Sequence, residues 1–262
     1  MSKVQSPKSE FSELASGAEK LPVTSADVAP WTSDLGLCVT DLRKSFSSPS
    51  GETIEVLRGA SFEAMPGETI AITGASGAGK STLLHLIGGL ETPDHGSVAL
   101  GQFEIERAHP ASLARFRNTQ MGLIFQFHHL LPDLTAAENV ALPLMMAREN
   151  RAATMKEALR ALAQVGLAAR ANHPVAHLSG GEQQRVAACR ALIGKPSLVL
   201  ADEPTGNLDA SYGAELGEIL VSYARSRPAI VVIATHNETL AELCDRVLVL
   251  NEGRLSERIY PH

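Results

Sequence analysis

One short segment constrains the fold of this 262-residue chain more than any other: residues 74–81 read Gly-Ala-Ser-Gly-Ala-Gly-Lys-Ser. The apolar run at residues 69–73 predicts a strand before it, and residues 80 to about 90 predict a helix after it. Glycines let backbone N–H groups point at phosphate oxygens, and the helix start adds the positive end of its dipole. An ordinary glycine-rich turn would not need this context. The predicted phosphate-binding loop consists of Gly74, Ala75, Ser76, Gly77, Ala78, Gly79, Lys80, Ser81 and Thr82.

Within this nucleotide site, Lys80 is expected to reach the β and γ phosphates, and the Ser81 hydroxyl is expected to bind Mg²⁺. Residues 197–204 predict a buried strand that ends in Asp202 and Glu203. Ligands of open α/β sheets bind at the carboxyl ends of strands, which predicts that Asp202 lies beside the phosphates. Asp202 suits magnesium, which takes few direct carboxylates, and Glu203 is expected to orient or deprotonate a water. The alternative is that Asp-Glu-Pro simply ends a strand.

A second helix start carries a related signal. Residues 178–185 read Leu-Ser-Gly-Gly-Glu-Gln-Gln-Arg, in which Ser179 and Glu182 form a predicted capping box. Capping alone does not explain Gly180 and Gly181, which have no side chains and so leave the backbone N–H groups at the helix start exposed. They therefore predict a second phosphate-sized anion site, although one nucleotide already occupies the first.

The order of the predicted elements indicates an α/β fold. Residues 35–42, 54–57 and 60–64 are strand-like and predict an antiparallel layer. Strands that are apolar on both faces alternate with helices, which predicts a parallel sheet covered on both sides. These strands are expected at residues 69–73, 198–201, 230–234 and 247–250. Residues 135–191 show helical patterns, including a capping box at Thr135 and Glu138, and predict a helical insert.

Composition excludes other classes of protein. The net charge of -6 is unfavourable for a protein that coats nucleic acid. The apolar stretches fall short of the ~20 residues of a spanning helix, and we expect no secretion signal at the start. Cys38, Cys189 and Cys244 are odd in number and widely spaced, which favours buried thiols in a reducing compartment. Residues 1–34 have many Ser and Ala and no sustained period, and predict a mobile tail whose one Trp, Trp31, could dock on the domain.

From residue 35 onward the motifs resemble, in order and spacing, those of ATP-binding-cassette (ABC) ATPases. The resemblance is carried by residues 74–81, Gln126, residues 178–184 and 198–203, Asp209 and His236. It implies an α/β P-loop NTPase of the ABC type, with a mixed sheet core, an antiparallel β layer and an inserted helical subdomain. The cassette would span residues 35–262, with the helical subdomain at about residues 127–190.

The family resemblance also implies an answer to the two anion sites. Two cassettes would pair head to tail, with each ATP between the P-loop of one and the Ser179, Gly180 and Gly181 helix of the other. It implies that Glu203 is the catalytic base and that His236 contacts the γ-phosphate. Gln126 would sense Mg²⁺ and water, and Asp209 would lie at the dimer seam. Where the family usually has a Tyr that stacks on adenine, this chain has Phe46, which keeps the aromatic face; a core Phe is the alternative.

Residues 81–93 and 124–140 resemble more narrowly the ATP-binding subunits of lipoprotein-releasing transporters. This implies a peripheral subunit on the cytoplasmic side of a Gram-negative inner membrane, with two integral membrane permease subunits as partners and lipoproteins as indirect cargo. The apolar residues Phe127, Leu130 and Leu131 suit a partner helix, although an ordinary surface loop is the alternative. Subunits of macrolide-efflux or cell-division type match Phe127 to Asp133 less well.

Two other function classes fit this sequence less well than a transporter subunit. Cassettes that act on DNA carry long coiled-coil insertions, and residues 135–178 are too short for one, so no nucleic-acid partner is expected. A nucleotide-gated binding module without activity would be expected to lack Glu203 or His236, and both residues are present. The sequence therefore predicts an ATPase that uses ATP and Mg²⁺.

Overall fold

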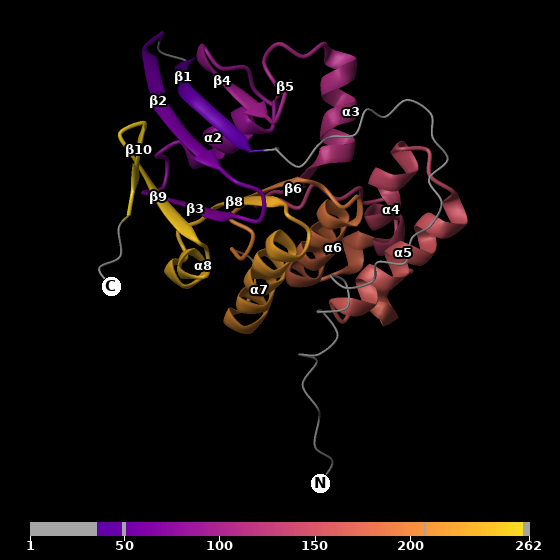
Figure 1. Cartoon of the computed structure of the whole chain (residues 1–262). Coiled ribbons are helices and arrows are strands. Elements are labelled where there is room, and N and C mark those ends of the chain that lie inside the picture. Colours follow the sequence, from indigo (N-terminus) through magenta and orange to yellow (C-terminus); the bar gives the residue numbers. More distant parts are fainter. Residues whose placement is uncertain (1–35, 49–50, 207, 259–262) are drawn as a thin grey trace.

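Two β-sheets organise the computed structural model, which describes residues 36–48, 51–206 and 208–258 (Figure 1). A four-stranded sheet has the order β2-β1-β4-β5, and a six-stranded sheet has the order β10-β9-β3-β8-β7-β6. The first sheet contains β1 Leu37–Ser47, β2 Thr53–Ala64, β4 His95–Leu100 and β5 Phe103–Glu104. The second contains β3 Thr69–Thr73, β6 Met121–Ile124, β7 Leu198–Asp202, β8 Ile230–Ala234, β9 Arg246–Asn251 and β10 Arg254–Glu257.

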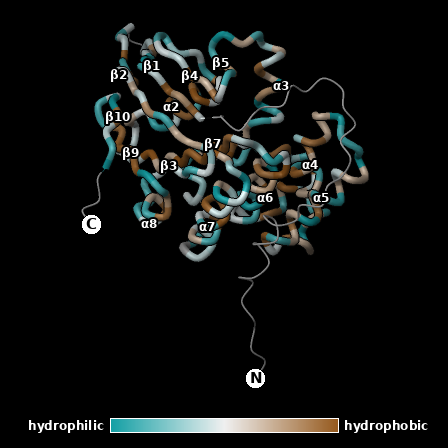
Figure 2. Tube along the Cα trace, in the orientation of Figure 1, coloured by the Kyte–Doolittle hydropathy of each residue, from teal (hydrophilic) through white to brown (hydrophobic). Residues whose placement is uncertain are grey.

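The six-stranded sheet is parallel except at one edge. Strands β9, β3, β8, β7 and β6 pair in parallel, and β10 returns antiparallel to β9. Every residue of β3, β7 and β8 is buried, as the apolar runs of the sequence predict for strands covered on both faces. Figure 2 shows hydrophobic residues concentrated in these central strands. The predicted mixed α/β core is therefore confirmed.

Helices cover both faces of this sheet. The helices are α2 Lys80–Ile87, α3 Pro110–Gln120, α4 Ala136–Met146, α5 Arg151–Gln164, α6 Gly180–Ile193, α7 Ala210–Ser226 and α8 Glu238–Glu242. On one face, α2 shares a core with the four-stranded sheet, in which Leu83, Leu86 and Ile87 pack with Leu42 and Leu57. On the other face, α6 and α7 pack against β6, β7 and β8. The main sheet is therefore packed on both faces, and the ends of its parallel strands remain as the places where a ligand could bind.

The four-stranded sheet differs in detail from the sequence prediction. Residues 53–64 form one continuous strand, β2. The prediction of two separate strands at residues 54–57 and 60–64 was therefore wrong. Gly59 continues the strand in a left-handed conformation (φ +99°), and a side chain there would meet the Asp41 carboxylate. Helix α2 also ends at Ile87, earlier than predicted, because Gly88 and the left-handed Gly89 follow it.

A helical cluster follows β6 and contains α4, α5 and α6 (Figure 1). Its own core includes Val140 from α4, Leu162 from α5 and Val186 from α6. Both capping boxes predicted from the sequence are present: Thr135 and Glu138 cap α4, and Ser179 and Glu182 cap α6. The helices at this position are those of the predicted helical insert, while the exact subdomain limits remain a prediction.

The remaining sequence predictions concern cysteines, membranes and the tail. All three cysteines are free thiols, but only Cys189 is buried as predicted, while Cys38 and Cys244 are half-buried. Desolvation raises the pKa of Cys189 to about 12 and that of Cys244 to about 11. In the described ranges, no helix is both long and apolar enough to cross a bilayer. The predicted tail of residues 1–34, including Trp31, lies outside the described residues.

Candidate nucleotide-binding site

The loop between β3 and α2 has a backbone that only glycine fits well. Gly74, Gly77 and Gly79 have positive φ angles of 146°, 79° and 100°. A Cβ at Gly74 would collide with the carbonyl oxygen of Leu250, and one at Gly79 would lie 2.7 Å from a methyl carbon of Val56. These close approaches explain the predicted glycine pattern and produce an open loop at the N-terminus of α2.

Lys80 lies inside this loop. Its side chain is buried, and its ammonium donates hydrogen bonds to the carbonyl oxygens of Gly74 (3.0 Å) and Ala75 (3.2 Å). Ser81 is exposed beside it, and Ser76 and Gly77 are exposed at the tip of the loop. The loop therefore holds a cation at its centre, where phosphate oxygens can replace the two carbonyl partners.

Two acidic side chains stand at the carboxyl end of β7, as predicted. Asp202 is buried, and its Oδ1 has no hydrogen-bond partner among the described residues. A buried carboxylate oxygen is costly to leave unpartnered, so a water or a metal ion fits this position. Within the described ranges, no three His, Cys, Asp or Glu side chains gather to hold a metal. The single carboxylate of Asp202 suits magnesium, which retains waters and binds phosphate oxygens with few protein ligands.

The next residue, Glu203, contacts His236 directly. Glu203 has a left-handed backbone (φ +45°), and its N–H donates to the carbonyl of Ala234 at 2.8 Å. Its Oε1 lies 2.9 Å from Nδ1 of His236, while its Oε2 accepts from the Thr235 hydroxyl and the His236 N–H, both at 3.3 Å. Two residues predicted from separate motifs thus meet where β7 and β8 end side by side. Thr235 is a partner that the sequence reasoning missed.

The second anion site predicted from the sequence would lie at the start of α6, where the predicted capping box is present. The Ser179 hydroxyl accepts from the Glu182 N–H (3.3 Å), and the Glu182 carboxylate accepts from the Ser179 N–H (2.8 Å). The Ser179 backbone N–H holds the pKa of Glu182 below its usual value, so this residue stays ionised. Gly180 is exposed, and a Cβ there would meet open space. Crowding by the described residues therefore does not explain the glycine.

Two further predicted site residues, Phe46 and Asp209, lie on β1 and at the start of α7. Phe46, on β1, is 41% exposed and has the Lys44 ammonium 5.3 Å from its ring centroid. It is therefore not a core Phe, and it offers an accessible aromatic face. Asp209 caps α7 by accepting hydrogen bonds from the Tyr212 N–H (3.1 Å) and the Ser211 hydroxyl (2.7 Å). The Ser211 hydrogen bond is the main cause of the lowered pKa of Asp209.

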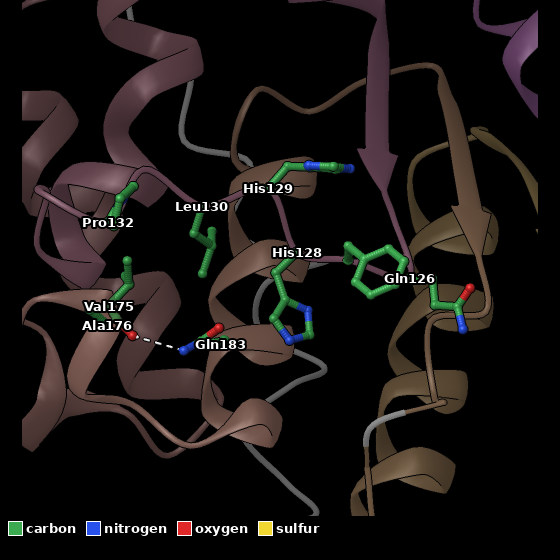
Figure 3. Close-up of a pocket in the computed structure, with 9 residues that line it drawn as sticks. Gln126, His128, His129, Leu130, Pro132, Val175, Ala176 and Gln183 are labelled. Carbon is green, nitrogen blue, oxygen red and sulfur yellow. Dashed lines mark hydrogen bonds between the residues drawn. The ribbon is translucent and has the colours of Figure 1, made fainter.

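Gln126 begins an exposed segment between β6 and α4. It is exposed and lines a hollow of about 430 Å³ together with residues of this segment and of the turn before α6 (Figure 3). Phe127 is 74% and Leu131 is 48% exposed, so both apolar side chains project from the surface. Burial lowers the pKa of His128, with a further contribution from the charge of Arg190, so this imidazole is neutral at pH 7.

The fold and this arrangement of loop, carboxylates and glycine helix define an ABC-type ATPase. A family model described as ABC transporter matches residues 57–206, more than half of the chain, so the chain belongs to this family and is an ATP-hydrolysing cassette.

Curated relatives and solved structures agree with this assignment. The chain is 50% identical over 218 residues to the lipoprotein-releasing system ATP-binding protein LolD of Geobacter metallireducens, covering 83% of this chain and 96% of that protein. It is 44% identical to LolD of Legionella pneumophila (strain Lens), covering 86% and 99%. A dimeric post-hydrolysis structure of the ATP-binding cassette MJ0796 bound to ADP and Pi is 34% identical, with a TM-score of 0.80 over 85% of this chain and 97% of that one.

Proposed function

We propose that this chain is the ATPase subunit of a transporter that releases outer-membrane-directed lipoproteins from the inner membrane. The observation that carries the proposal is its 50% identity over 96% of the length of a LolD protein. A macrolide-efflux or cell-division subunit, the alternative from the sequence, is not favoured by these relatives. The cargo would be contacted indirectly, since the cassette supplies energy and the membrane subunits supply the path.

The residues of the loop and of β7 would divide the work of ATP hydrolysis. Lys80 and the loop N–H groups would hold the phosphates. Ser81, Gln126 and Asp202 are the residues proposed for the Mg²⁺ site. When bound, magnesium would neutralise phosphate charge. Glu203 is the proposed base for the attacking water, and His236, which already contacts its carboxylate at 2.9 Å, would hold the reacting geometry.

Two copies would close on two nucleotides. Each ATP would lie between the loop of one copy and Ser179, Gly180 and Gly181 of the other, with Phe46 stacked on adenine and Asp209 at the seam. The exposed Gly180, which the chain's own packing does not explain, supports this arrangement. So does the dimeric MJ0796 structure, which contains ADP and Pi.

The membrane partners would be two integral permease subunits resembling LolC and LolE. The proposed docking surface is the exposed segment with Phe127 and Leu131, because isolated apolar side chains projecting from a surface suit a partner helix. The chain would therefore work as a peripheral subunit on the cytoplasmic side of the inner membrane. No nucleic acid is expected as a partner.

Co-purification followed by reconstitution tests this function. The chain, affinity-tagged in its own membranes, should retain two permeases after detergent extraction. Proteoliposomes of that complex should then release a lipoprotein to a soluble acceptor only with ATP and Mg²⁺. Recovery of a drug-efflux or septal permease, or ATP hydrolysis without lipoprotein release, would contradict the proposal.

A further inference from the structure

Two polar side chains that the nucleotide site does not use bind backbone groups of the exposed segment of residues 127–131. One is Arg190, near the C-terminal end of α6, and the other is Asn139, in α4. We propose that both are positioning residues, which join this segment to α6 and α4 so that motion at the nucleotide end of α6 reaches Phe127 and Leu131. The inference rests on the proposed function, in which these two side chains dock the membrane partner.

Arg190 holds two successive backbone carbonyls. Its Nη1 donates to the carbonyl of His129 at 2.7 Å, and its Nη2 donates to the carbonyl of His128 at 2.8 Å. His129 has a left-handed backbone (φ +46°), which indicates a sharp local turn at this point. Because the planar guanidinium fork makes both bonds at once, it constrains direction as well as distance. A lysine could satisfy only a part of this geometry.

Asn139 holds the other end of the segment. It is fully buried, and its Oδ1 accepts from the Leu131 N–H at 2.8 Å. Its Nδ2 lies within hydrogen-bond distance of the carbonyls of Leu131 (3.1 Å), Thr135 (3.0 Å) and Leu134 (3.3 Å). Both backbone polar groups of Leu131 are therefore bound by one side chain. The backbone of the exposed Leu131 is therefore hydrogen-bonded to α4 through one side chain.

Helix α6 connects the two functions. Ser179, its N-cap, and Gly180 belong to the proposed second phosphate site, and Arg190 lies ten residues further along the same helix. At 1.5 Å per residue the separation along the axis is about 15 Å. Val186 and Cys189 of α6 pack in the core that also contains Val140 of α4. A displacement of the start of α6 is therefore passed on by one packed helix to the carbonyls that Arg190 binds.

A spin label at position 127 measures this connection in the isolated chain. Phe127→Cys is suitable because the side chain is 74% exposed, and Cys38→Ser and Cys244→Ala remove the other accessible thiols. Glu203→Gln in the same chain keeps ATP bound during the measurement. We expect Mg·ATP to change the label mobility, Arg190→Ala to abolish that change, and Arg190→Lys to preserve part of it. Arg160→Ala, an exposed arginine of α5, is the matched control.

The full complex provides the second readout. In Arg190→Ala, ATP turnover and KM of the isolated chain should stay within about twofold of the parent, while the permease-stimulated activity falls about tenfold. Asn139→Asp, which keeps the acceptor for Leu131 and loses the donor, should show an intermediate loss. If Arg190→Ala does not fold by circular dichroism, Arg190→Lys carries the same test.

Three results would overturn the inference. They are an unchanged ATP response of the label in Arg190→Ala, an equal loss of isolated and stimulated turnover, and no rescue by Arg190→Lys. Failure of the proposed function is distinguishable from these results, because a chain that docks no permease would still show the label response and its loss in Arg190→Ala.

Discussion

The phosphate loop and the helical cluster are built in opposite ways. Around the loop, side chains find their partners inside the chain: Lys80 binds two loop carbonyls and Glu203 contacts His236. In the helical cluster and the exposed segment before it, Gly180 and the Phe127 side chain face outward and have no comparable internal role among the described residues. Under the proposed function, the groups for the chemistry lie within one chain, whereas nucleotide sharing and docking would need other chains. Substitutions in the two regions should therefore fail in different assays.

The largest effect on ATP turnover is expected from a substitution of Glu203, whose carboxylate contacts His236. Glu203→Gln keeps the size of the side chain and its contact with the end of β8, but it removes the proposed base. ATP turnover should fall by ~10²–10⁴ while ATP binding is retained. Steady-state phosphate release and equilibrium nucleotide binding measure the two quantities. Glu242→Gln, at an exposed position of α8, is the control, and near-normal turnover in Glu203→Gln would exclude the assignment.

A smaller effect is expected from the cation within the loop. Lys80→Ala removes a charge-assisted donor to phosphate, so ATP affinity should fall by about 10- to 100-fold. Isothermal titration with ATP and Mg²⁺ measures it, and Lys156→Ala on the exposed side of α5 should bind normally. Unchanged affinity in Lys80→Ala would count against the phosphate-binding assignment.

The local parts of this fold were predictable from sequence because their signals are local. The loop glycines, the two capping boxes at Thr135 and Ser179, and the buried strands each depend on neighbouring residues. The contact between Glu203 and His236 follows once their strands are known to be neighbours, since β7 and β8 pair in parallel. Adjacent strand ends could therefore have suggested that contact.

Other features depend on pairings that no short pattern reveals. Arg190 binds carbonyls 61 and 62 positions away, which an ordinary arginine in a helical pattern does not suggest. The continuity of β2 through Gly59 depends on its register with β1 and on the turn at Gly253, whose carbonyl accepts from the Arg58 N–H at 2.8 Å. From the sequence alone, a glycine within such a strand suggests that the strand is interrupted there.

Substitutions in the docking surface should impair assembly with the permeases rather than nucleotide binding or hydrolysis. Phe127→Asp together with Leu131→Asp places charges where apolar contact is proposed, so retention of the permeases should fall more than about tenfold. ATP affinity of the isolated chain should stay unchanged, which separates this region from the loop. Quantitative co-purification measures the first property. Leu159→Asp, another exposed leucine of the helical cluster, is the control, and normal co-purification of the double variant would refute the docking surface.

The smallest effect is expected where the helical cluster contacts helix α7. The Arg185 guanidinium of α6 lies 4.2 Å from the ring centroid of Tyr212, in the first turn of α7, so a cation–π contact links the helical cluster to a helix that covers the main sheet. Tyr212→Leu should lower the free energy of unfolding by about 0.5–1 kcal/mol, the usual range at exposed sites. Tyr212→Phe keeps the aromatic face and should retain most of this stability. Urea denaturation distinguishes the two variants, and equal losses in both would show that the hydroxyl, rather than the ring over Arg185, joins α6 and α7.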